Sequence, residues 1–248
     1  MPNKVYIVGA GPGDKELLTL KAKRLIEEAD CIIHDRLIGK DILGFARTDA
    51  ELIYVGKGDT FRTVEQEGIN EMLAEKYKEG KKVVRLKGGD PFIFGRGGEE
   101  TLFLAEQKIP FEVVPGITAA VGVSAYSGIP LTDRNFSSSV TLITGHSMKG
   151  TGLPDTNWKS LATLGGTIVF YMGLKNLPVI SKNLIDNGME SNTPTAVIRW
   201  GTVSEQEVVI GTLTDIADKV SNKGITPPAL VIIGKVVSYR EILDWFGE

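Results

Sequence analysis

The chain has 248 residues, and 28 Lys and Arg against 31 Asp and Glu give a net charge of 28 − 31 = −3. This mildly acidic balance argues against binding to nucleic acid or anionic lipid through general basic charge. One Cys and two His exclude an internal disulfide and argue against a metal centre, and the cysteine usage fits a cytoplasmic protein. No apolar run is long enough for a signal-peptide core or a membrane span.

The N-terminal half alternates short apolar runs with Gly-rich turns and amphipathic stretches. Asp14 can cap a helix after the first run, and Thr63 with Gln66 matches a capping box for a helix that continues to residue 77. A further helix is predicted at residues 98–107. Strands alternating with helices predict an α/β fold with parallel pairing in at least this half. The predicted strands are residues 5–8, 31–34, 52–55, 83–86 and 111–114.

Pro115-Gly116 marks the predicted boundary between an N-terminal domain, residues 1–115, and a C-terminal domain, residues 116–248. The second half continues the same alternation. Helices are predicted at residues 118–126, 177–187, 214–221 and 240–246, and strands at residues 140–144, 167–171, 195–200, 207–210 and 230–236. Only a short turn separates the third and fourth of these strands, so we expect them to pair antiparallel.

Glycine makes up 29 of the 248 residues, and one cluster follows the first predicted strand, at residues 9–13. A dinucleotide-binding fingerprint would need G-x-G-x-x-G here, but Pro12 interrupts it and Asp14 occupies the third glycine position. Asp14 would also place negative charge where a pyrophosphate binds, so an NAD-dependent oxidoreductase is disfavoured. No P-loop pattern is present either. The remaining alternatives are a ligand-binding loop and a tight turn without a ligand.

A second glycine loop, Gly88-Gly89-Asp90-Pro91, also follows a predicted strand. Ligands of open α/β sheets bind at the carboxyl ends of strands, and paired glycines let a ligand approach the backbone closely. The Asp90 carboxylate can accept hydrogen bonds from ribose hydroxyls or an amine, but it is unsuited to a phosphate. The two loops therefore favour a nucleoside without phosphates, with a simple turn cap as the alternative role for Asp90.

Two long motifs contain these loops: VGAGPGD at residues 8–14, with LLTLKA at 17–22, and VVRLKGGDPFIFGRG at residues 83–97. Both resemble the signatures of the tetrapyrrole methylases, the class III S-adenosylmethionine-dependent methyltransferases. The resemblance runs from about residue 4 to the C-terminus, and we expect no additional domain for precorrin-2 oxidation and ferrochelation. Shorter matches are HDRLI at 34–38, VGK at 55–57, PGITAA at 115–120, GIPLT at 128–132, TGH at 144–146, YMGL at 171–174 and WGT at 200–202.

The resemblance implies two αβα domains with the cofactor cleft between them, and a homodimer. It also implies a folded S-adenosylmethionine held largely by backbone groups, with no metal. For Met172 the alternative is ordinary core packing at a strand end. Matched position by position, the implied cofactor contacts are Pro12, Gly88, Gly89, Asp90, Ile93, Thr118, Ala119, Met172, Gly201 and Ala229.

Within the family, the residues at 34–37 and 56–57 are most similar to members that methylate uroporphyrinogen III at C2 and C7, giving precorrin-2. This resemblance implies that Asp35 is the base and Lys57 the acid, and both follow predicted strands. The alternatives are a salt bridge to Arg36 or a helix cap for Asp35, and a solvated charge for Lys57. Cys31, which begins a predicted buried strand, is expected in the core.

The implied substrate carries eight carboxylates, so its site needs Arg or Lys, and we favour Arg36 and Arg134. Asp133 stands where many bacterial relatives carry His, which adds negative charge beside Arg134. The alternatives within the family are a later corrin-pathway methylase and methylases of rRNA ribose or a diphthamide intermediate. From another class, the chain could be a nucleoside-binding regulator without turnover.

Overall fold

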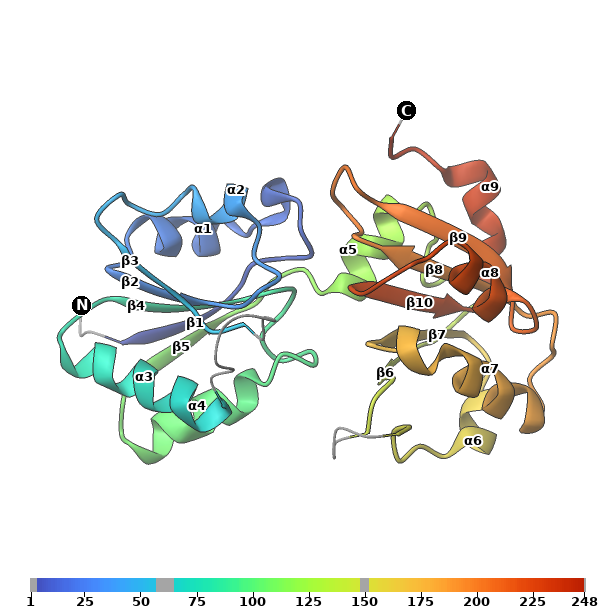
Figure 1. Cartoon of the computed structure of the whole chain (residues 1–248), viewed down its shortest axis with the longest axis horizontal. Coiled ribbons are helices and arrows are strands. Elements are labelled where there is room, and N and C mark those ends of the chain that lie inside the picture. Colours follow the sequence, from blue (N-terminus) through green and yellow to red (C-terminus); the bar gives the residue numbers. More distant parts are fainter. Residues whose placement is uncertain (1–3, 57–64, 148–151, 248) are drawn as a thin grey trace. The chain divides into compact units, whose positions relative to one another are not determined.

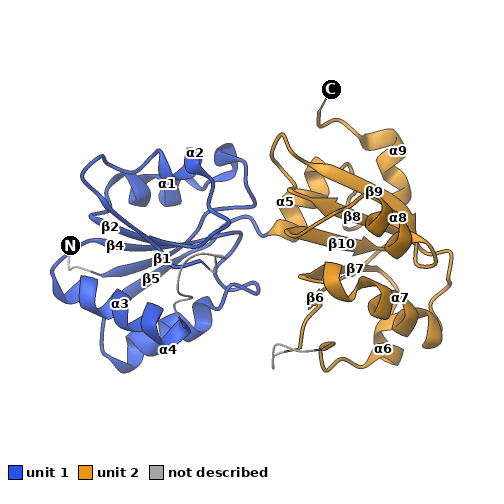
Figure 2. Ribbon diagram, viewed as in Figure 1, with its two compact units in different colours: residues 1–118 blue, residues 119–248 orange. Residues whose placement is uncertain are grey.

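The computed structural model describes residues 4–56, 65–147 and 152–247, and the chain divides into two compact units, residues 1–118 and 119–248 (Figure 2). Each unit is built on its own five-stranded sheet with helices packed against it. The predicted α/β class is therefore confirmed.

The sheet of unit 1 is parallel throughout and has the strand order β3-β2-β4-β1-β5. All residues of β2 and β4 are buried, as expected for strands covered on both faces. The predicted strands and their parallel pairing are confirmed. Their bounds are β1 Val5–Gly9, β2 Cys31–His34, β3 Glu51–Tyr54, β4 Val83–Lys87 and β5 Phe111–Val114.

Helices cover both faces of this sheet (Figure 1). The helices α1 (Leu20–Glu27) and α2 (Lys40–Leu43) pack on one face, and α3 (Gln66–Lys78) and α4 (Gly97–Glu106) pack on the other. The helices that follow β1 and β2 thus lie on one face of the sheet, and the helix that follows β4 lies on the other. Open α/β sheets bind ligands at such a reversal, outside the carboxyl ends of the strands. The fold therefore places the ligand-binding edge at the end of β4.

The start of one helix differs from the prediction. Asp14 caps only a 3-10 turn, η1 (Lys15–Leu17), where its carboxylate accepts the Glu16 N–H at 2.9 Å. Thr19 caps α1 by accepting the Ala22 N–H at 3.1 Å, so the helix begins later than Asp14 indicated. Thr63 of the predicted capping box lies outside the described residues.

Unit 2 has the strand order β6-β7-β10-β8-β9, in which β6 and β7 pair parallel and the other neighbours pair antiparallel. The predicted antiparallel pair β8–β9 is confirmed. The prediction that the last strand reaches residue 236 is wrong, because Gly234 (φ 144°) turns the chain into a 3-10 segment, η3 (Lys235–Tyr239). The strands are β6 Val140–Thr144, β7 Thr167–Tyr171, β8 Pro194–Arg199, β9 Glu207–Thr212 and β10 Ala229–Ile233.

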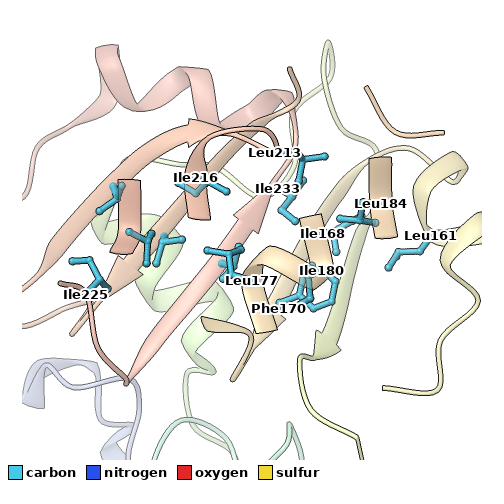
Figure 3. Packing of buried hydrophobic residues seen from close by; sticks show 14 residues of the cluster. Leu161, Ile168, Phe170, Leu177, Ile180, Leu184, Leu213, Ile216, Ile225 and Ile233 are labelled. Carbon is cyan, nitrogen blue, oxygen red and sulfur yellow. The ribbon is translucent and has the colours of Figure 1, made fainter. Parts of the chain in front are cut away.

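The larger apolar core of unit 2 lies between this sheet and the helices α6 (Trp158–Thr163), α7 (Leu177–Asp186) and α8 (Ile216–Asn222) (Figure 3). Phe170, Ile180 and Leu184 are fully buried there. A second core lies on the opposite face, under α5 (Ala119–Tyr126) and η3. The remaining elements are η2 (Leu174–Asn176) and α9 (Arg240–Leu243).

Glu112 on the edge strand β5 forms ion pairs with Lys4 and with Lys21 of α1. These pairs hold the pKa of Glu112 at about 2 in the folded chain, below its usual value near 4.5. The stability they provide is therefore present above about pH 4.5 and is lost as the pH falls toward 2. We expect Glu112→Gln to lower the melting temperature at pH 7 by about 2 °C. The difference in melting temperature between the variant and the wild type should shrink as the pH falls from 7 to 3. Glu106→Gln, at an exposed position, is the control and should show no such pH dependence. A difference that does not change with pH would contradict the role given to the Glu112 ion pairs.

Candidate functional site

The two glycine loops of unit 1 are joined by backbone hydrogen bonds at the carboxyl ends of β1 and β4. Ala10 N–H donates to the Lys87 carbonyl at 2.8 Å, and Gly11 and Gly89 exchange N–H···O bonds of 3.2 and 2.7 Å. Gly11 (φ 74°) and Gly89 (φ 66°) both have left-handed backbone, which glycine adopts without a steric penalty. The motifs that the sequence singled out therefore form one glycine-lined surface.

The segment after β5 packs on the same surface, backbone against backbone. A Cβ on Gly116 would lie 2.3 Å from the Gly89 carbonyl oxygen, and one on Gly9 would lie 2.6 Å from the Gly116 nitrogen. Because the opposing atoms belong to the main chain, no side chain can move aside to make room. These glycines are therefore required for the three strand ends to meet.

Asp90 ties these loops together. Its Oδ1 accepts the Phe92 N–H at 2.8 Å, and its Oδ2 accepts the Gly116 N–H at 3.1 Å. The turn-cap role is thus present, and each carboxylate oxygen keeps a further lone pair for a ligand donor. Beside it, Phe92, Ile93 and Phe94 are 57%, 36% and 41% exposed, so apolar side chains border the glycine surface.

Asp35 follows β2 at the same edge of the sheet, and its side chain is 32% exposed. Arg85 Nη2 donates to Asp35 Oδ1 at 2.5 Å, and Lys87 Nζ lies 4.0 Å from Asp35 Oδ2. The ion-pair alternative for Asp35 therefore holds, but with Arg85 rather than Arg36, whose side chain is exposed. Lys57, the predicted acid, lies outside the described residues.

Behind Asp35 lies a group of buried charges in which Glu100 of α4 is fully buried and Arg85 and Lys87 of β4 are 2% and 3% exposed. Glu100 Oε1 accepts hydrogen bonds from Arg85 Nε at 2.9 Å, Lys87 Nζ at 2.8 Å and Gln66 Nε2 at 3.3 Å. Burial, with the adjacent Arg85 charge, lowers the pKa of Lys87. Asp35 is thus the exposed end of a buried ionic network.

Sequence reasoning assigned no role to Arg85, Lys87 or Glu100. The signal was available in the strand VVRLK, where two cations two residues apart point to one face of an otherwise apolar, buried strand. Charged residues are almost never fully buried unless they are paired, so this spacing indicates a partner on the helix that covers that face.

The predicted positions in unit 2 lie on several elements. Ala119 begins α5, and Ala229 begins β10. Met172 follows β7 with φ 53° and a side chain that is 51% exposed, so the alternative of core packing is wrong. A Cβ on Gly201 would lie 2.6 Å from the Val123 side chain of α5, so local packing also requires a glycine there. Arg134 is exposed, in a turn closed by two Asp133–Ser137 backbone hydrogen bonds.

Cys31 is fully buried, which confirms its predicted place in the core. This burial raises the pKa of its thiol to about 11. Within the part of the chain that the structure describes, no three His, Cys, Asp or Glu side chains are grouped so that they could hold a metal ion. None of the described helices is both long and apolar enough to cross a bilayer.

Comparison with known proteins gives consistent results. Residues 4–217 match the model of the Tetrapyrrole (Corrin/Porphyrin) Methylases. The chain is 50% identical to uroporphyrinogen-III C-methyltransferase of Bacillus subtilis, covering 98% of this chain and 94% of that protein. It is 53% identical to siroheme synthase of Pseudoalteromonas atlantica over 98% of this chain, but it spans only 52% of that protein, about half its length.

Among solved structures, uroporphyrin-III C-methyl transferase of Thermus thermophilus, crystallised with S-adenyl homocysteine, matches with a TM-score of 0.82 and 40% identity. The match covers 95% of this chain and 99% of that one. The resemblance of the motifs, the match to the family model and the likeness to this structure agree. The chain belongs to the tetrapyrrole methylase family.

Proposed function

We propose that the chain is an S-adenosylmethionine-dependent C-methyltransferase that methylates uroporphyrinogen III at C2 and C7, giving precorrin-2 and two S-adenosylhomocysteines. The observation that carries the proposal is the 50% identity to the Bacillus subtilis enzyme over nearly the full length of both proteins. The joined glycine loops and the partly exposed Asp35, all at one edge of the unit 1 sheet, support it.

The unit 1 surface fits a nucleoside methyl donor because it offers bare backbone, apolar side chains and one carboxylate with lone pairs to spare. When bound, S-adenosylmethionine supplies an electrophilic methyl group on sulfur. In unit 1, the residues that would hold it are Pro12, Gly88, Gly89, Asp90, Ile93 and Thr118. In unit 2, they are Ala119, Met172, Gly201 and Ala229.

Asp35 is the proposed base, because a proton must leave the macrocycle after each methylation and a carboxylate can accept it. Its hydrogen bond from Arg85 fixes the carboxylate, and its partial exposure leaves it accessible. Lys57 is the proposed acid. Arg36 and Arg134, both exposed, are proposed partners for substrate carboxylates.

The assembly and location proposed for the chain follow from the family. We propose a cytoplasmic homodimer that acts on a small tetrapyrrole without binding nucleic acid or membranes. The predicted domains, residues 1–115 with the acid and base and residues 116–248 completing the cofactor site and the dimer contact, remain part of this proposal.

One experiment tests the activity directly. Purified protein is incubated anaerobically with uroporphyrinogen III and methyl-labelled S-adenosylmethionine, and the product is weighed by mass spectrometry. We expect two labelled methyl groups per macrocycle. Cofactor binding without transfer would favour a nucleoside-binding regulator, and transfer only to a precorrin substrate would favour a later corrin-pathway methylase. Either result would overturn the proposal.

A further inference from the structure

Three buried charged residues of unit 1 lie behind the proposed base, and of these three Arg85 donates a hydrogen bond to its carboxylate. We call Arg85, Lys87 and Glu100 the charge cluster. None is more than 3% exposed, so none is placed to touch a tetrapyrrole directly. Burying charges is costly unless they are paired, so three in one place call for an explanation beyond packing.

Among the described residues, the charge cluster is bonded to two partly exposed groups, Asp35 through Arg85 and Gln66 through Glu100. Arg85 donates from Nε to Glu100, from Nη1 to the backbone carbonyls of Ile33 and Leu86 at 3.3 and 3.2 Å, and from Nη2 to Asp35. Four hydrogen bonds in three directions leave the guanidinium in one orientation. A continuous path therefore runs from Lys87 through Glu100 and Arg85 to the Asp35 carboxylate.

The charge balance depends on Asp35. With Lys87 protonated, the charge cluster carries two positive charges and one negative, a net +1, and ionised Asp35 brings the total to zero. If Lys87 lost its charge, the cluster would be neutral without Asp35. Lys87 therefore supplies the positive charge that favours ionised Asp35. Glu100 offsets part of the positive charge of the cluster and holds both cations in place through hydrogen bonds.

Few other described groups lie near Asp35. His34 precedes it, with Nδ1 3.2 Å from the Asp35 carbonyl oxygen and its ring edge-on to Tyr54 of β3, and the exposed Arg36 follows it. Among the described residues, Arg85 and Lys87 are the ones that form ion pairs with the Asp35 carboxylate.

We propose that Lys87 and Glu100 are positioning residues that act together with Arg85 to hold Asp35 as an oriented, ionised carboxylate at the strand edge. The role of that carboxylate as proton acceptor rests on the proposed function. The control of its ionisation by the charge cluster does not. Burial lowers the pKa of Lys87, and its hydrogen bond to Glu100 and the nearby Asp35 charge oppose that shift.

The test uses two substitutions that change the charge in opposite directions. Lys87→Met removes a positive charge near Asp35 and is expected to move the midpoint of the carboxyl titration to higher pH. Glu100→Gln removes a negative charge and is expected to move that midpoint to lower pH. Lys87→Arg keeps the charge and is expected to restore the wild-type value. Lys82→Met is the matched control, because Lys82 lies just before β4 and pairs with Glu28 instead. It should leave the midpoint of the carboxyl titration unchanged.

The midpoint is read from the carboxyl ¹³C signal of aspartate-labelled full-length protein, titrated between pH 3 and pH 8 without substrate. The signal that disappears in Asp35→Asn assigns the resonance. In parallel, single-turnover methyl transfer is followed against pH, and its acidic limb should move with the Asp35 titration. Melting curves identify variants that have not folded, and either of the two charge variants is sufficient for the test.

The outcomes separate the two proposals. Opposite shifts in the two charge variants support the inference, even if the wild-type protein transfers no methyl group, in which case only the proposed function fails. Shifts in the same direction, or no shift in a folded Lys87→Met or Glu100→Gln protein, overturn the inference. Normal methyl transfer with an unmoved acidic limb in Lys87→Met overturns it as well.

Discussion

Asp35→Asn is expected to reduce the single-turnover rate of methyl transfer by a factor of about 100 or more, because the amide cannot accept the macrocycle proton. The substitution keeps the size of the side chain and an oxygen that can accept from Arg85. The affinity for S-adenosylmethionine should therefore stay close to wild type, whereas the melting temperature should fall, because the charge cluster loses the anion that balances it. Rapid-quench kinetics with labelled cofactor measure the chemical step, and calorimetry measures binding.

Asp41→Asn, an exposed Asp in the first turn of α2 in the same unit, is the matched control and should leave all three quantities unchanged. A wild-type single-turnover rate in Asp35→Asn would contradict the assignment of Asp35 as the base. A parallel loss of cofactor affinity would instead place Asp35 in the binding surface.

Gly116→Ala is expected to destabilise the protein by about 3 kcal/mol, at the upper end of the usual cost of overpacking. The new Cβ would lie 2.3 Å from the Gly89 oxygen and within 3 Å of Gly9 main-chain atoms, so the strand ends must separate. The hydrogen bond from Gly116 N–H to Asp90 would be disturbed at the same time. Under the proposed cofactor assignment, S-adenosylmethionine should bind at least tenfold more weakly, about 1.4 kcal/mol.

Gly98→Ala provides the control, since a Cβ there meets nothing within 4 Å and Gly98 lies in the exposed first turn of α4. Alanine favours helix more than glycine, so this variant should be as stable as wild type or slightly more stable. Urea unfolding and calorimetry are measured on both variants. Equal stability of the Gly116 and Gly98 variants would contradict the close packing of the three strand ends.

The strands of unit 1 were predictable from sequence because parallel strands buried on both faces are short, continuous apolar runs ended by glycine or polar residues. The segments 31–34 and 111–114 were predicted with the bounds that the structure has. The helices α2 and α6 were missed, because four and six residues are too short for a helical period to be visible.

The candidate site was predictable only in part, because sequence motifs show local structure but not contacts between distant segments. Local motifs reveal which residues follow a strand, so the glycine loops and Asp35 could be placed at strand ends. The partner of Asp35 could not be identified in this way, because Arg85 is 50 residues away and pairing between distant strands depends on sheet order. In the same way, nothing local to residues 229–233 indicates that they insert between β7 and β8.

That insertion has a consequence for synthesis on the ribosome. β10 is the last strand of unit 2 to be translated, yet it lies in the middle of the sheet and joins β6-β7 to β8-β9. Until it emerges from the exit tunnel, the nascent chain holds two half-sheets with unpaired edges, which are prone to aggregation. Unit 1, whose strands all lie within the first 118 residues, can fold long before. The sheet of unit 2 can therefore be completed only during the last stretch of translation.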